Sequence, residues 1–249
     1  MSEDLTGKIA FVTGGSNGIG AATVRQLAEA GAQVIIGYNS GKERAEALLS
    51  ELPGDGHSVQ QLTLEDSASV KGACDNIKAN NSKLDVLVNS AGFTKPIPHD
   101  DLDALDDEFL DHMLIANVRG PFSVIRGLRP LLVAGGDSVI VNLSSVSGFK
   151  GSGSSIAYVA CKAAIDTMSL ALARVLGPEI RVNCVSPGAV ATDFVAGRDR
   201  EKLEKLAESS PLQKVVDPED VALAIMAYVT HLKHSTGARM VVDSGRFLK

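Results

Sequence analysis

The chain has 249 residues, of which 45% are hydrophobic and 22% charged, and its formal net charge is −6. Its Lys and Arg residues are scattered rather than clustered, which argues against a nucleic-acid-binding or anionic-membrane-binding protein. The length and hydrophobic content suit one α/β domain over residues 1–249, and they favour a small molecule as the partner.

Seven short runs rich in Val, Ile and Leu alternate with segments of helical length. The runs predict strands at 9–12, 34–36, 59–62, 86–88, 139–143, 181–185 and 240–242. The intervening segments predict helices at 18–30, 42–52, 68–79, 105–133, 156–176 and 218–231. Because the strands are mostly apolar rather than alternating, they indicate a sheet covered on both faces. The repeated order predicts a Rossmann fold, a doubly wound, seven-stranded parallel sheet with helices on both faces.

Two stretches are irregular and predict mobile loops. Residues 148–155 are rich in Gly and Ser, and residues 189–214 are charged and follow a strand end. We expect the segment 189–214 to act as a substrate lid and to carry a short helix at 202–208. Asp217-Pro218 has the pattern of a helix N-cap followed by proline at the first helical position.

The cysteines and the N-terminus bear on the cell compartment. Cys74, Cys161 and Cys184 are odd in number and lack Cys-x-x-Cys spacing, which argues against a disulfide framework. Residues 1–8 are acidic and polar, unlike a signal peptide, and the run 9–12 is too short to span a membrane. No His, Asp and Glu residues have metal-ligand spacing. We therefore expect a cytoplasmic protein with no metal.

A glycine-rich turn, Thr13-Gly14-Gly15-Ser16-Asn17-Gly18-Ile19-Gly20, joins the first predicted strand to the first predicted helix. Glycines allow a tight turn and a close backbone approach, and the free N–H groups at a helix start attract a pyrophosphate. The turn therefore predicts a dinucleotide site. A plain β-α turn is the alternative when this turn is considered by itself.

Tyr158 and Lys162 stand four residues apart in a predicted helix, so their side chains share one face. A cation beside a phenol lowers the pKa of the phenol, which would let Tyr158 act as an acid or base near neutral pH. The pair alone is a weak signal, because Tyr-x-x-x-Lys often arises by chance on a solvated helix face.

The motifs together resemble the classical short-chain dehydrogenase/reductase family, in its 3-oxoacyl reductase-like subgroup. The resemblance covers essentially the whole chain. Its motifs are the turn at 13–20, Asn89-Ser90-Ala91-Gly92, Asn117, Ser145, Tyr158 with Lys162, and Pro187-Gly188 with Thr192. Ser90 departs from the second Asn of the family's Asn-Asn-Ala-Gly.

The resemblance implies a catalytic role for four residues. Tyr158 would protonate a carbonyl oxygen during reduction, and Ser145, chosen over Ser144 by its distance from Tyr158, would hydrogen-bond the same oxygen. Lys162 would hold the nicotinamide ribose and lower the pKa of the phenol, and Asn117 would place a water beside it. Taken singly, Ser145 could be a turn former and Asn117 a helix-bending amide. A Ser-His-Asp hydrolase is disfavoured, because the sequence has no Gly-x-Ser-x-Gly and its histidines are expected at the surface.

The resemblance also indicates the cofactor. An NAD-specific site places Asp or Glu at the end of the second strand, where this chain has Tyr38. We expect NADP(H) to be preferred and NAD(H) to remain possible, with Lys42 or Arg44 as candidate cations for the 2′-phosphate. The cofactor contacts we expect are Gly14, Ser16, Asn17, Gly18, Ile19, Gly20, Tyr38, Asn39, Ser40, Leu64, Asn89, Ala91, Gly92, Tyr158, Lys162, Pro187, Gly188, Val190 and Thr192.

These expectations favour an oxidoreductase that interconverts a carbonyl and a secondary alcohol. A 3-oxoacyl-thioester reductase is one alternative, although residues 134–138 lack the Lys/Arg cluster that an acyl-carrier partner would favour. A catalytically silent dinucleotide-binding regulator is another. Segment 163–172 is apolar on more than one face, and the resemblance implies a homotetramer assembled through it, through 105–133 and through the last strand. Packing within the chain is the alternative for that face.

Overall fold

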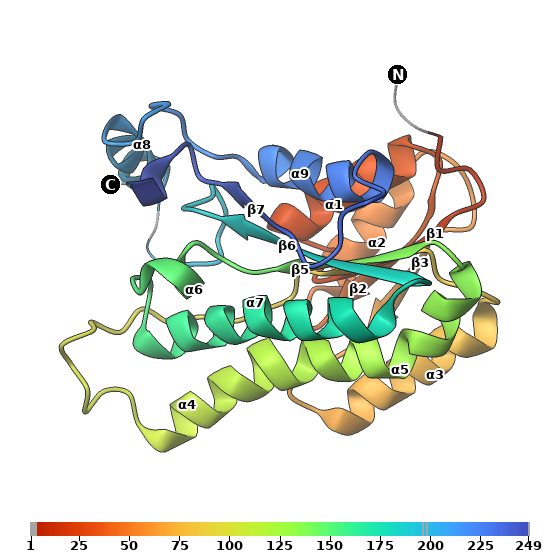
Figure 1. The fold of residues 1–249 in the computed structure, drawn as a ribbon, viewed down its shortest axis with the longest axis horizontal. Helices are drawn as coiled ribbons and strands as arrows, with labels where there is room; N and C mark the ends of the chain where they lie inside the picture. The colour runs from red at the N-terminus through yellow and green to blue at the C-terminus, as the bar shows by residue number, and fades with distance from the viewer. Residues whose placement is uncertain (1–3, 196, 198, 249) are drawn as a thin grey trace.

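The sheet organises the molecule. The structure is a computed structural model, which describes residues 4–195, 197 and 199–248, so the lid positions 196 and 198 lie outside the described residues (Figure 1). Within this part of the chain, seven parallel strands are arranged in the order β3-β2-β1-β4-β5-β6-β7. Their bounds are β1 (Ile9–Thr13), β2 (Gln33–Tyr38), β3 (Ser58–Gln61), β4 (Val86–Asn89), β5 (Ser138–Leu143), β6 (Ile180–Pro187) and β7 (Arg239–Val242). The predicted doubly wound sheet is confirmed, with each strand end within two residues of its expected position.

Helices cover both faces of the sheet, as Figure 1 shows. One face carries α1 (Gly18–Glu29), α2 (Lys42–Glu51) and α9 (Pro218–Thr230). The opposite face carries α3 (Ser67–Asn80), α5 (Gly120–Gly135) and α7 (Ile156–Leu176).

Alternate residues of the five inner strands enter two different cores. In β1, Val12 packs with α1 and α9, whereas Phe11 points to the opposite face and packs with α3 and α5. Burying one such side chain contributes about 1.5–3 kcal/mol. Both faces therefore need apolar residues, which explains why the strand sequences lack a polar alternation.

The helix expected at 105–133 is confirmed over 107–135, with one departure from regular α-helical geometry. A π-helical segment, Ile115–Arg119, separates α4 (Asp107–Leu114) from α5. Near its centre, the side-chain amide of Asn117 donates to the Met113 carbonyl at 3.0 Å. Pro121, just beyond the segment, has no N–H to continue the hydrogen-bond ladder. Both features disfavour a regular α-helical hydrogen-bond pattern at this point.

The irregular stretches contain short helices. The first begins with α6 (Ser147–Lys150), where only a loop was expected. The second contains α8 (Arg200–Glu208), which confirms the expected helix and starts two residues earlier because Asp199 caps it. Asp217 and Asp220 form a capping box at the start of α9, as the Asp-Pro signal predicts. A 3₁₀ turn, Arg246–Leu248, follows β7.

Candidate active site

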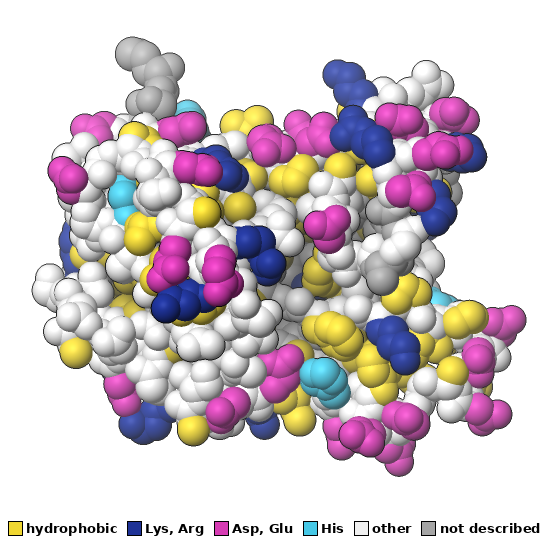
Figure 2. Space-filling view, turned by 180° about the vertical axis from the view of Figure 1, so that it is seen from behind, with side chains coloured by type: hydrophobic (Ala, Val, Ile, Leu, Met, Phe, Trp, Pro, Cys, Tyr) yellow, Lys and Arg dark blue, Asp and Glu magenta, His cyan; other side chains and the backbone are white. Residues whose placement is uncertain are grey.

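A cavity of about 630 Å³ lies beyond the carboxyl ends of the strands. The connections after β1, β2, β4, β5 and β6 all contribute to its wall, which is where ligands bind in doubly wound sheets. Figure 2 shows the molecule hollowed on this side, with hydrophobic side chains gathered beside the hollow. The cavity brings together residues that are separated by more than 200 positions in the sequence, from Gly14 to Phe247.

Most of the predicted site residues line this cavity. They are Gly14, Ser16, Asn17, Gly18, Ile19, Tyr38, Asn39, Ser40, Leu64, Ala91, Gly92, Ser145, Tyr158, Lys162, Pro187, Gly188, Val190 and Thr192. Gly20, Asn89 and Asn117 lie behind its wall. The roles of all these residues remain predictions.

The glycine turn leaves room for a ligand at the start of α1. Gly14 has a φ of +65°, and a Cβ there would lie 2.9 Å from the Cα of Ala91. Gly18 has a φ of +50°, and the side-chain oxygen of Asn17 accepts from its N–H at 2.8 Å. A Cβ at Gly20 would clash with the Gly14 carbonyl, so Gly20 serves the packing of the turn. The glycines thus keep the turn tight and its backbone at the cavity, an arrangement that fits the pyrophosphate of a dinucleotide.

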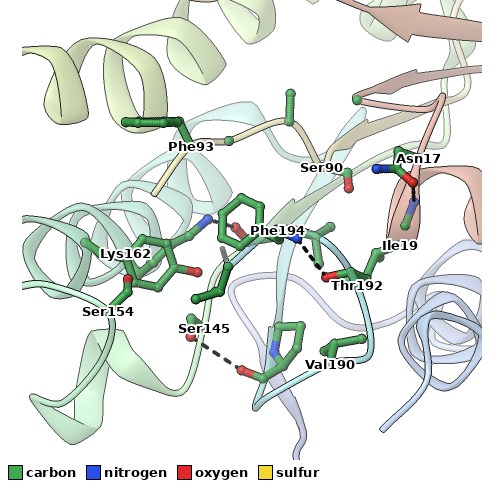
Figure 3. A pocket seen from close by; sticks show the side chains of 18 of the residues that line it. Asn17, Ile19, Ser90, Phe93, Ser145, Ser154, Lys162, Val190, Thr192 and Phe194 are labelled. Atoms are coloured by element: carbon green, nitrogen blue, oxygen red, sulfur yellow. Dashed lines mark hydrogen bonds between the residues drawn. The ribbon is translucent and has the colours of Figure 1, made fainter. Parts of the chain in front are cut away.

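Tyr158 and Lys162 are placed by the first turns of α7. The hydroxyl of Ser155 caps this helix by accepting from the Tyr158 N–H at 3.1 Å, which fixes where the turn begins. The ammonium of Lys162 lies 5.6 Å from the centroid of the Tyr158 ring. Ser145 follows β5 on the facing wall, and its hydroxyl accepts from the Ser147 N–H at 3.1 Å. Figure 3 shows Ser145 and Lys162 facing the same cavity.

Burial sets the charge state of Lys162. Its side chain is buried, and its ammonium donates to the Leu143 carbonyl at 2.7 Å. Burial lowers its pKa from 10.5 to about 8, with small opposing contributions from Cys161, Cys184 and Asp166. The group is therefore still mostly protonated at neutral pH, but it titrates much closer to neutrality than an exposed lysine does.

The two asparagines behind the wall hold parts of the chain together. The side-chain oxygen of Asn117 accepts from the Phe93 N–H at 3.0 Å, which ties the π-helical segment to the connection after β4. Asn89 donates to the side-chain oxygen of Asn142 at 2.9 Å, linking β4 to β5. Both residues position neighbouring elements of the site.

The opposite end of the cavity, near β2, carries the candidates for contact with an adenosine ribose. Tyr38, Asn39, Ser40 and Arg44 line it. Lys42 does not, because it extends along α2 and pairs with Glu46 at 3.5 Å. The structure therefore distinguishes two cations that the sequence left equivalent, and Arg44 is the one beside the cavity.

Sequence reasoning missed two contributors at the C-terminus. Arg246 and Phe247, which follow β7, also line the cavity. The signal that could have found them is Asp243-Ser244-Gly245, a turn pattern directly after the last strand. The histidines are exposed or half-buried, as expected, and one of them has a structural contact. His57 accepts from the Val34 N–H at 3.0 Å and helps to fix the start of β2.

The described residues contain no group of three or more His, Cys, Asp or Glu placed to hold a metal ion. The cysteines are free and buried. Burial raises the pKa of the Cys74 and Cys161 thiols to about 11 and that of Cys184 to about 12. Protonated at neutral pH, these thiols are poor nucleophiles.

The chain has a Rossmann-type sheet with a cavity at the carboxyl ends of its strands. Its relatives place it among the NAD(P)-dependent oxidoreductases. Residues 14–246 match the family described as enoyl-(acyl carrier protein) reductase. The chain belongs to the short-chain dehydrogenase/reductase family and is similar to its 3-oxoacyl reductases.

Individual relatives match the chain over nearly its whole length. It is 34% identical over 242 residues to the granaticin polyketide synthase putative ketoacyl reductase 2 of Streptomyces violaceoruber, covering 96% of both chains. It is 31% identical over 245 residues to a 3-oxoacyl-(acyl-carrier-protein) reductase of Staphylococcus aureus, covering 97% of this chain and 98% of the relative. Among solved structures, a Burkholderia cenocepacia short-chain dehydrogenase in complex with NADP has a TM-score of 0.89 at 32% identity, with coverage of 98% and 99%.

Proposed function

We propose that this chain is an NADP(H)-dependent carbonyl reductase, which interconverts a carbonyl and a secondary alcohol with Tyr158 as the general acid or base. The observation that carries the proposal is the convergence of Tyr158, Lys162 and Ser145 on one cavity that also contains the glycine cradle. When bound at this cavity, the nicotinamide would supply the hydride that reduces the carbonyl carbon, or would accept one from the alcohol carbon in oxidation.

The protein's own groups act at the carbonyl oxygen. In reduction, the Tyr158 hydroxyl gives its proton to this oxygen as negative charge develops there, and in oxidation the phenolate takes the proton back. The Ser145 hydroxyl donates a hydrogen bond to the same oxygen. The positive charge of Lys162 favours the phenolate form that this cycle requires. Asn117 fixes the connection after β4 by accepting from the Phe93 N–H. The water that we expect beside Asn117 would complete the proton path from Lys162 to solvent.

Arg44 supports the preference for NADP(H). The residue at the end of β2 is Tyr38, so no carboxylate stands there to repel a 2′-phosphate. The Arg44 guanidinium lies against Gly41 at the edge of the cavity, where it could pair with a phosphate. The structural relative with NADP is consistent with this preference.

A 3-oxoacyl thioester is the second candidate substrate. The names of the relatives from Streptomyces and Staphylococcus favour it, because both are ketoacyl reductases. Residues 134–138 offer no basic cluster for an acyl carrier. A thioester of a small carrier molecule is therefore a better candidate substrate than a thioester attached to a large acidic carrier protein.

The experiment that tests the function compares the parent with Tyr158→Phe. NADPH oxidation is followed with a panel of ketones and 3-oxoacyl thioesters, and cofactor binding is measured separately. We expect kcat to fall by about 10²-fold or more, because a general acid is lost, while NADPH affinity is retained. Parental turnover in the Phe variant would show that another group is the acid, and retained cofactor binding without turnover of any carbonyl by the parent would favour a silent regulator.

We also propose a cytoplasmic homotetramer. The free, buried cysteines are consistent with a reducing compartment. Helix α7 has the length and apolarity of a membrane span, but Ala157, Cys161 and Ile165 are buried within this fold. Leu170 and Val175 are exposed on the same helix, at 46% and 70%, and could pack against another subunit. Light scattering would measure the assembly directly.

A further inference from the structure

Two cations line the end of the cavity that lies away from Arg44. Lys150 is the last residue of α6, which follows β5, and Arg246 follows β7. In the strand order, β1 and β4 separate β2 from β5, and β7 is an edge strand at the far side of the sheet. These cations therefore belong to the half of the site beyond Ser145 and Tyr158, where the substrate rather than the adenosine would lie.

Helix α6 is held firmly enough to position Lys150. A Cβ at Gly148 would lie 2.7 Å from the backbone nitrogen of Ala163, so this helix packs directly on the backbone of α7. The Phe149 ring meets the edge of Phe247 at 5.6 Å between centroids. The Arg239 guanidinium lies 4.1 Å from the Phe149 centroid.

The C-terminal turn is fixed by one buried carboxylate. Asp243 accepts from the Gly245 N–H at 2.8 Å and from the Phe247 N–H at 2.6 Å. This arrangement brings Arg246 next to α6, where the Lys150 ammonium donates to the Arg246 carbonyl at 3.4 Å. Within the described part of the chain, the Arg246 guanidinium makes no ion pair or hydrogen bond.

We propose that Lys150 and Arg246 form an anion subsite, and that the carbonyl substrate carries a carboxylate or phosphate group that binds there. This inference rests on the proposed carbonyl reduction and specifies its substrate class. A guanidinium can bind either anion through two parallel N–H donors, and a nearby ammonium adds a second positive charge. Two carboxylates, Asp193 and Glu65, also line the cavity. Glu65 follows β3, next to β2 at the adenosine end, so Asp193 is the carboxylate on the substrate side.

Matched substrate pairs test the subsite. One arm compares acetoacetate with its methyl ester, which removes a carboxylate charge. The other compares acetoacetyl-CoA with acetoacetyl-N-acetylcysteamine, which removes the phosphates. We expect the parent to favour the charged member of at least one pair in kcat/KM, and the arm that shows the preference identifies the source of the anion.

Arg246→Met should reduce that preference about 10- to 100-fold, the range for loss of a hydrogen bond to a charged group. Arg246→Lys should restore part of it, because the charge remains. Lys150→Met should also lower the ratio of kcat/KM for the charged substrate to kcat/KM for its neutral partner. Lys71→Met is the matched control, since Lys71 is exposed on α3 and does not line the cavity, and it should leave the ratio unchanged.

Calorimetry with 3-hydroxybutyrate and with phosphopantetheine provides a readout that does not require turnover. If one of these anions binds the parent and binds Arg246→Met more weakly, the subsite is supported. If the parent then reduces no carbonyl, the proposed function fails but the subsite stands. Equal substrate ratios in the parent and Arg246→Met, together with equal anion binding, would overturn the subsite. Turnover of the neutral substrates would then still support carbonyl reduction.

Discussion

Replacing Lys162 by Met should make the protein more stable while removing its activity. The ammonium is buried, and its pKa falls from 10.5 to about 8 on folding. At 1.36 kcal/mol per pKa unit, this shift corresponds to a cost of about 3 kcal/mol for keeping the charge inside the fold. Met occupies a similar volume without the charge, but it leaves the buried Leu143 carbonyl without its hydrogen bond to a charged group, a loss of about 2 kcal/mol. The expected net gain is about 1 kcal/mol.

The gain should depend on pH in a defined direction. The folded-state pKa of Lys162 lies below its unfolded-state value, so the cost is full below pH 8, where the group is charged in both states. Above pH 8 the folded protein loses this proton first, and the cost disappears as the pH approaches 10.5. The difference in stability between the variant and the parent should therefore shrink over that interval.

Thermal unfolding followed by circular dichroism, without cofactor, measures this difference. A gain of about 1 kcal/mol corresponds to a Tm higher by about 2–4 °C at pH 7 for a chain of this size. Lys71→Met, which removes an exposed charge from α3, should leave the Tm close to that of the parent. A Lys162→Met protein no more stable than the parent at pH 7, or a gap that stays constant up to pH 10, would refute the reasoning.

The remaining predictions concern the two ends of the cavity. NADPH should bind more tightly than NADH. Arg44→Met should remove most of that preference, and Tyr38→Asp should reverse or erase it. Lys42→Met should change it little, because Lys42 pairs with Glu46 and does not line the cavity. A parental preference for NADH in titrations would contradict the assignment. The proposed lid, 189–214, should gain protection from hydrogen exchange when NADP(H) and a substrate analogue bind, since the Phe194 ring already lies 6.0 Å from that of Tyr158. Unchanged protection, together with an unaltered KM in Phe194→Ala, would leave no support for a lid.

Many features of the fold and the site could be predicted from short-range sequence patterns. The apolar strands, the glycine turn and the caps depend on neighbouring residues, so their spacing in the chain already encodes them. Tyr158 and Lys162 fall on one helical face by the geometry of a single turn. The carboxyl ends of parallel strands meet at one edge, which explains why motifs distant in the sequence could be assigned to one site.

The π-helical segment shows where local patterns were insufficient. Its sequence is apolar at helical spacing and reads as part of one long helix. The interruption depends on the Asn117 side chain, which bonds the Met113 carbonyl on one side and the Phe93 N–H on the other. The second of these bonds crosses to a different connection, so helical periodicity could not reveal it.

The sequence by itself determined the order of strands and helices, the glycine cradle and the Tyr158–Lys162 pair, because each follows from short-range spacing. Only the tertiary structure decided that Arg44 rather than Lys42 faces the cavity, and that Arg246 lies beside Lys150 although 96 positions separate them. It also decided the charge behaviour of Lys162, because a pKa shift of this kind arises from removing an ammonium from water. Burial depends on all the elements packed around a group, and that information is not contained in any local motif.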